Sequence, residues 1–152
     1  MKFNPDAVRE TLLYIENSLN YDNDEPYITH FDIINNIEEC KLYDKNDIRY
    51  SIEVLLTTNF LNLVQNPVYN VDGELIIVRI KGLTYSGCNF LDNIRKPEIW
   101  SIVEKKAKSL GVYSINAIGF AGAELSKALL TDSNALKNFM EGLENIKNIV
   151  GI

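Results

Sequence analysis

The hydrophobic periodicity changes once within residues 44–80, whose sequence is DKNDIRYSIEVLLTTNFLNLVQNPVYNVDGELIIVRI. At first, apolar residues recur at helical spacing, which predicts a helix over about residues 44–59. Residues 60–65 and 74–80 are then rich in strand-forming side chains, and Asp72-Gly73 between them is a turn signal. This stretch therefore predicts one helix followed by a β-hairpin.

Two more helices are predicted upstream of this stretch. Asn4 before Pro5 is typical of a helix start, and a single apolar stripe follows it. The stripe consists of Val8, Leu12, Ile15 and Leu19. Thr29 and Asp32 predict the cap of a second helix that runs to about Cys40, after a short edge strand at Tyr27-Ile28. The inward residues expected in this helix are Phe31, Ile34 and Ile37.

The order of these elements predicts the fold class. Three helices, with a close turn between the second and the third, and then a hairpin are typical of a winged helix-turn-helix domain. We therefore expect an α+β fold with a winged helix-turn-helix module over residues 1–82. Residues 83–152 are expected to form a C-terminal helical extension packed on that module.

The segment after the hairpin predicts a fourth helix. Residues 83–91 have the pattern Leu-Thr-x-x-Gly-x-x-Phe-Leu. Thr84 can cap the helix, and Gly87 would allow it to approach the sheet closely. Phe90 and Leu91 are expected in the core.

This segment, with Asp92-Asn93-Ile94-Arg95 and Trp100 after it, also resembles a known family. The family consists of small bacterial and phage-associated proteins and is catalogued as a domain of unknown function. The resemblance covers roughly residues 5–110 and is clearest over 83–100. It implies a winged helix followed by further helices and, by analogy, a regulatory or host-takeover role, but it transfers no catalytic residue.

Three helices are predicted in the C-terminal part. Pro97 can start the first, which ends at Gly111, and Ser114 can cap the second. The expected buried residues of the first are Ile99, Ile102 or Val103, and Leu110. Gly119 and Gly122 in the second indicate close helix packing or a kink, because each glycine weakens a helix by about 1 kcal/mol.

The last predicted helix, capped by Ser133, has apolar residues at the spacing of a coiled-coil seam. They are Leu136, Phe139, Leu143, Ile146 and Val150. Two interpretations fit this pattern. The one we favour is packing against the rest of the same chain. The other is a homodimer interface built by Leu136, Phe139, Leu143 and Ile146.

Acidic charge is concentrated in the first part of the chain. Residues 1–43 carry 3 basic and 9 acidic groups, a net of −6, whereas residues 44–82 and 83–152 have nets of −1 and +1. DNA-binding surfaces usually gather Lys and Arg, because neutralised phosphates release counterions. The sequence contains no such stripe. Its densest basic cluster, Lys105, Lys106 and Lys108, is expected on a solvated helix face.

The sequence offers little catalytic chemistry. His30 is the single histidine and is expected at the surface or as a capping residue, while Cys40 and Cys88 are expected to be reduced, half-buried thiols. We find no phosphate-binding loop and no metal-ligand spacing, and we expect no catalytic residue, cofactor or small-molecule ligand. The N-terminal residues lack the apolar core of a signal peptide, so we expect a cytoplasmic protein without a membrane span.

Two hypotheses for the function, from different classes of protein, remain after these observations. The favoured one is a non-enzymatic protein-interaction or assembly module that binds a partner protein or a second copy of itself. The acidic first segment supports it, because negative charge repels DNA but not a basic protein surface. The alternative is a DNA-binding transcriptional regulator, in which helix 44–58 and a wing around Asn66 to Asn70 contact DNA. Its contact residues would be Lys45, Asn46, Arg49 and Tyr50.

Overall fold

A computed structural model of the chain describes residues 3–19, 24, 26–39, 43–111, 113–132, 134, 137, 138, 141, 142 and 145. These residues form an α+β structure with six helices and small antiparallel sheets. The chain divides into two compact units, Met1–Leu91 and Asp92–Ile152, and the division lies inside the fourth helix. The boundary after residue 82 stays a prediction.

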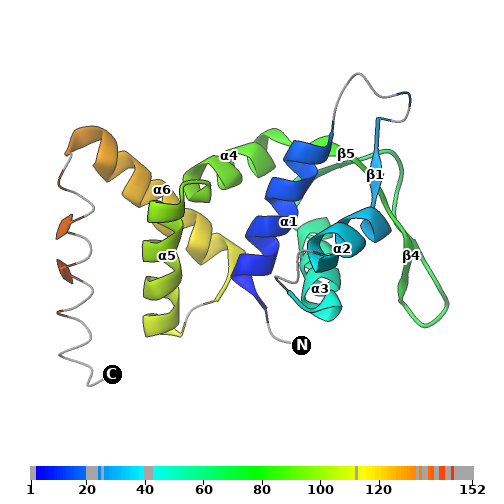
Figure 1. Ribbon diagram of the computed structural model, residues 1–152, viewed down its shortest axis with the longest axis horizontal. Coiled ribbons are helices and arrows are strands. Elements are labelled where there is room, and N and C mark those ends of the chain that lie inside the picture. The colour runs from blue at the N-terminus through cyan, green and yellow to red at the C-terminus, as the bar shows by residue number, and fades with distance from the viewer. Residues whose placement is uncertain are drawn as a thin grey trace. The chain divides into compact units, whose positions relative to one another are not determined.

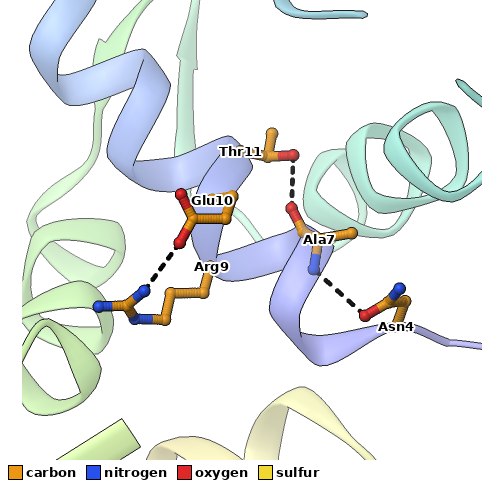
Figure 2. Close-up of polar contacts among 5 residues, drawn as sticks. All are labelled: Asn4, Ala7, Arg9, Glu10 and Thr11. Carbon is orange, nitrogen blue, oxygen red and sulfur yellow. Dashed lines mark hydrogen bonds and ion pairs between the residues drawn. The ribbon is translucent and has the colours of Figure 1, made fainter. Parts of the chain in front are cut away.

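Helix α1 (Pro5–Ser18) begins with the predicted cap. Figure 2 shows the Ala7 amide donating to Asn4 Oδ1 at 3.3 Å, and the Thr11 hydroxyl donating to the Ala7 carbonyl one turn later at 2.7 Å. Arg9 and Glu10 form an ion pair beside this turn, at 2.8 Å. The predicted stripe is buried at Val8, Leu12 and Ile15, whereas Leu19 is the half-buried C-cap.

Helix α2 (His30–Glu39) follows strand β1 (Ile28–Thr29) directly. The predicted cap is confirmed, because Asp32 Oδ2 accepts hydrogen bonds from both the amide and the hydroxyl of Thr29 at 2.7 Å. The predicted inward face is confirmed at Ile37 but wrong at Phe31, which is half exposed; Ile34 is half-buried. The buried positions are instead His30, Ile33 and Ile37. The prediction that His30 is a surface residue is therefore also wrong. Because α2 begins immediately after a strand, its first side chain faces the sheet rather than solvent.

Helix α3 (Lys45–Leu56) starts at its predicted N-cap, Asp44, whose side chain accepts from the Asn46 amide. It packs against α1 and α2, and α1 also packs against the sheet, as Figure 1 shows. Burial of Ile48, Ile52 and Leu55 follows the predicted spacing. The three helices thus form the core of the first unit with one face of the sheet.

The hairpin is more divided than the sequence predicts. Its strands are β2 (Leu61–Leu63), β3 (Val68–Tyr69), β4 (Leu75–Ile77) and β5 (Arg79–Leu83). Three strands form an antiparallel sheet in the order β1-β5-β2, whereas β3 and β4 form a separate two-stranded ribbon. The predicted continuous strand over 74–80 is interrupted at Val78, because the Val78 amide donates to the side chain of His30 at 3.4 Å.

Helix α4 (Tyr85–Ile94) agrees with the prediction made from residues 83–91. Thr84 Oγ1 accepts from the Gly87 amide at 3.1 Å, and Phe90 and Leu91 are buried. A Cβ atom at Gly87 would lie 2.3 Å from the backbone oxygen of Phe60. Gly87 therefore permits the close approach to the end of α3 and the start of β2.

The second unit contains helices α5 (Pro97–Leu110) and α6 (Ile115–Thr131), which pack against each other. The predicted starts are confirmed, with Ser114 accepting from the Ala117 amide, and α5 ends at Gly111 with φ 63°. Of the two alternatives for the α6 glycines, close packing holds at Gly122. A Cβ there would lie 2.8 Å from the backbone oxygen of Asn93.

One expectation for α5 is wrong, because Leu110 is mostly exposed and Ala107 is buried instead. Leu110 lies in the last helical turn, where the αL backbone of Gly111 ends the helix. Ser133, Leu136, Phe139, Leu143, Ile146 and Val150 lie outside the described residues, so the seam of the last helix stays a prediction. Among the described helices, none is long and apolar enough to span a bilayer.

Candidate functional site

The first candidate surface is the outer side of α3, which the sequence proposed for DNA contact. Lys45, Asn46 and Arg49 are exposed there, and Tyr50 is half-buried. The start of this helix is held in place because the Asn4 side-chain amide donates to Asp47 Oδ2 at 3.0 Å. The structure therefore presents three of the four proposed residues to solvent at the N-terminal end of α3.

Charge on and around this helix is mixed. The α3 sequence contains Lys45 and Arg49 but also Asp47 and Glu53, and the exposed cap Asp44 precedes it. Residues 1–91 contain 7 Lys or Arg and 14 Asp or Glu, a net charge of −7. A polyanion would be repelled by the unit as a whole, whatever contacts Arg49 makes locally.

The second candidate surface is the hairpin, which extends away from the three helices (Figure 1). Four large apolar side chains on its ribbon are substantially exposed, and Val64 at its base is exposed as well. The four are Val68, Tyr69, Val71 and Ile76. We call them the hairpin cluster. Sequence reasoning missed it, because Val68, Tyr69 and Val71 fall in the loop predicted between two strands, where only the turn signals were interpreted.

The tip of the hairpin is ordered by one side chain. Asn70 Oδ1 accepts from the amides of Asp72 and Glu74 at 3.0 and 2.8 Å, and Asn70 Nδ2 donates to Glu74 Oε2 at 3.0 Å. Gly73 completes the turn with φ 81°, which glycine adopts without strain. Val71, in the centre of this turn, is completely exposed. The tip thus holds an apolar side chain in a defined position toward solvent.

The base of the hairpin is fixed to α2 through His30. Because the Val78 amide donates to His30 Nδ1, the neutral ring carries its proton on Nε2, which has no partner within the described ranges. Burial lowers the pKa of His30 from its ordinary value, and the Arg49 guanidinium lowers it further against the opposing effect of Asp32. His30 is therefore a neutral structural residue that positions the hairpin.

The remaining predicted residues add no second site in the first unit. Cys88 is a free, half-buried thiol, as predicted, and Cys40 lies outside the described residues. Within the part of the chain that the structure describes, no three His, Cys, Asp or Glu residues are grouped so that they could hold a metal ion. The proposed dimer residues Leu136, Phe139, Leu143 and Ile146 are likewise not described.

The chain was compared with known proteins at three levels. Neither the curated proteins nor the solved structures contain a match. A family model described as "Hypothetical protein (DUF2513)" matches residues 2–113, which include the whole first unit together with α5. The chain therefore belongs to the DUF2513 family, a family defined by a domain of unknown function.

Proposed function

We propose that residues 1–91 form a winged-helix module that binds a partner protein through its hairpin and has no enzymatic activity of its own. The element order α1-β1-α2-α3-β2-β3-β4-β5 and the antiparallel sheet order β1-β5-β2 support the winged-helix assignment. In this assignment α2 and α3 are the helix-turn-helix, and the β3–β4 ribbon is the wing. The association with phages that the family resemblance implies stays a prediction.

The observation that carries the proposal is the exposed hairpin cluster on an ordered tip. Exposed apolar side chains held in one conformation are suited to a protein interface, because little ordering entropy is lost on binding. Tyr69 is the anchor we expect, since tyrosine is enriched among residues that dominate interface energies. The sequence from Phe60 to Val78 contains no Lys or Arg, whereas Asp72 and Glu74 are exposed beside Val71.

This composition also indicates the kind of partner. The partner surface would be an apolar patch flanked by Lys or Arg, which complements both the hairpin cluster and the net charge of −7 on residues 1–91. A phosphate backbone satisfies neither requirement. The wing of a DNA-binding winged helix would need cationic side chains where residues 60–78 have none.

DNA binding is the second candidate, because Lys45, Asn46 and Arg49 are exposed together on α3. If it is correct, the Arg49→Glu substitution abolishes binding, and the wild-type affinity falls steeply with salt. In this candidate Lys45, Asn46, Arg49 and Tyr50 are the contact residues, and the wing around Asn66 to Asn70 only touches the DNA backbone. The two functions therefore depend mainly on different residues of the same unit.

The experiment is affinity capture from cells with the full-length protein, followed by measurement of the dissociation constant with the purified partner. We expect Tyr69→Ala to weaken the complex by about 30-fold, the effect of removing an interface residue worth about 2 kcal/mol. Tyr85→Ala is the matched control, because Tyr85 is an even more accessible tyrosine, on α4. It should leave the affinity unchanged.

Three results would oppose the proposal. Equal affinity of the wild-type and Tyr69→Ala proteins would remove the hairpin from the interface. Equal losses in Tyr69→Ala and Tyr85→Ala would indicate a nonspecific effect. Salt-sensitive retention of DNA fragments that Arg49→Glu abolishes and Tyr69→Ala does not would replace the proposal with the DNA-binding alternative.

A further inference from the structure

The second unit has an apolar groove between α5 and α6. It has a volume of about 310 Å³. Its lining is mainly apolar and includes Val103, Ala107, Leu110, Ile118, Phe120 and Ala121, while Lys106 and Glu124 add charged groups. Phe120 is 69% exposed and Leu110 is 55% exposed, so two of the large apolar side chains of the groove are accessible. Exposure of grouped large apolar residues is typical of a surface that another segment covers.

The helical conformation is interrupted directly after α6. The helix ends at Thr131, and Asp132 adopts an extended conformation. The Asn134 amide donates to Asp132 Oδ1 at 2.9 Å, and the Asn138 amide donates to the Asn134 carbonyl at 3.0 Å, which is the first bond of a new helical turn. Two helices joined by so short a connection usually fold back antiparallel to each other.

The described positions of this new turn are all polar or small and all exposed. They are Lys137, Asn138, Glu141, Gly142 and Asn145, each helical. Lys137 and Glu141 face each other at 4.0 Å on this side. In the sequence, the apolar residues Leu136, Phe139, Met140, Leu143 and Ile146 are interspersed with them. Helical periodicity therefore predicts that these apolar residues share the face opposite the exposed polar one.

We propose that residues 133–152 dock into the α5–α6 groove of their own chain through Leu136, Phe139, Leu143 and Ile146. The occupant and the site fit in chemistry, since an apolar helix face meets an apolar groove. They also fit in length: a helix of 20 residues is about 30 Å long and α6, with 17, is about 25 Å. The inference is independent of the hairpin and of its partner.

The short connection between α6 and residues 133–152 favours this segment over a second copy of the chain as the occupant of the groove. A segment joined by a connection of a few residues has an effective concentration in the millimolar range at its own groove. A second copy reaches that concentration only if the protein itself is millimolar. The chain's own segment therefore occupies the groove first, and the spacing typical of a coiled coil serves packing within the chain.

The test is backbone hydrogen exchange of the full-length protein. We expect the amides of residues 136–147 to be protected in the wild type and to exchange at least about tenfold faster in Phe120→Asp, which places a charge on the groove wall. Because Phe120 is exposed, α6 itself should keep its protection. Tyr85→Asp is the matched control, since it makes a comparable change at an exposed aromatic residue of the first unit and should not alter this protection.

A second pair of variants keeps the result interpretable. Phe139→Asp should deprotect the same amides from the side of the segment, and Leu110→Asp replaces Phe120→Asp if that variant loses protection throughout α5 and α6. Rapid exchange of residues 136–147 in the wild type would overturn the proposal, as would protection that neither groove variant reduces. Protection that rises with protein concentration, together with a dimer mass by light scattering, would overturn it in favour of a second copy.

Discussion

The base and the tip of the hairpin have similar apolar composition but opposite environments. At the base, Val78 and Ile80 are buried, and toward the tip Val68, Tyr69 and Val71 are exposed, although Leu75 opposite Tyr69 is buried. Ile80 belongs to the three-stranded sheet packed on α1, whereas the ribbon has only two strands. We propose that apolar residues in one hairpin therefore serve folding stability at the base and contact with a partner at the tip.

The transition between the two lies at Val78. Its amide leaves the strand pairing and donates to His30, so the ribbon and the sheet separate at this residue. The buried side of the transition should respond to mutation through folding stability. The exposed side should respond through affinity with little change in stability.

The largest expected difference comes from the same substitution on the two sides of Val78. Ile80 on the central strand β5 is completely buried, so Ile80→Ala should lower the free energy of unfolding by about 2–5 kcal/mol, the range for core Ile-to-Ala changes. Ile76 on β4 is about half exposed, so Ile76→Ala should cost under about 1 kcal/mol. Urea unfolding of the two variants measures both values. Equal losses would mean that the ribbon is part of the core.

The pH dependence tests the attachment of the hairpin to α2. In the folded protein, burial and Arg49 lower the pKa of His30 below its ordinary value of 6.5. Below about pH 6.5 the unfolded state therefore binds more protons at this residue than the folded state does. The stability that neutral His30 provides is complete above about pH 6.5 and is lost as the pH falls from there through the folded-state pKa. One such group changes stability by at most about 1.4 kcal/mol per pH unit.

The control for this effect is His30→Gln, which keeps a hydrogen-bond acceptor for Val78 and does not titrate. His30 is the single histidine, so other groups contribute equally to both proteins between pH 7 and pH 5.5. The unfolding free energy of the wild type should decrease more steeply over this interval than that of the variant. Parallel curves would show that His30 can be protonated without loss of the fold.

These features mark the limits of prediction from the sequence. The caps at Asn4, Asp44 and Ser114 could be predicted, because a capping side chain and the amides it accepts from lie within three residues. The inward position of His30 could not, because it depends on the sheet that precedes and faces α2. The break at Val78 requires a partner 48 residues earlier, which no local pattern reveals.

The candidate site was less predictable than the fold. The sequence placed a wing near residues 66–70 and proposed contact residues on α3, and both lie in the first unit. It did not single out Tyr69 and Val71, because both fall in the loop predicted between strands 60–65 and 74–80, where only the turn signals were interpreted. The one local signal was Val71 itself, an apolar residue directly before the turn signal Asp72-Gly73.

A smaller effect is expected at the side chain that orders the tip. Asn70→Ala removes three hydrogen bonds made by one exposed side chain, so global stability should fall by about 1 kcal/mol. The local effect should be clearer: the amides of Asp72 and Glu74 lose their acceptor and should exchange faster. Asn66→Ala, at an exposed position of the connection between β2 and β3, is the matched control. Unchanged exchange at Asp72 and Glu74 would mean that the backbone alone orders the tip.

The smallest effect on stability is expected at Val71. This substitution distinguishes most directly between a role of the tip in folding stability and a role in partner binding. Because Val71 is completely exposed, Val71→Asp removes no buried area, and the unfolding free energy should change by less than about 0.5 kcal/mol. The affinity for the partner should nevertheless fall, because the substitution places a charge at the centre of the hairpin cluster. Urea unfolding and partner binding, measured on the same preparation, give both values. A loss of stability above about 1 kcal/mol would show that Val71 packs within the folded protein, and the tip would then belong to the core like the base.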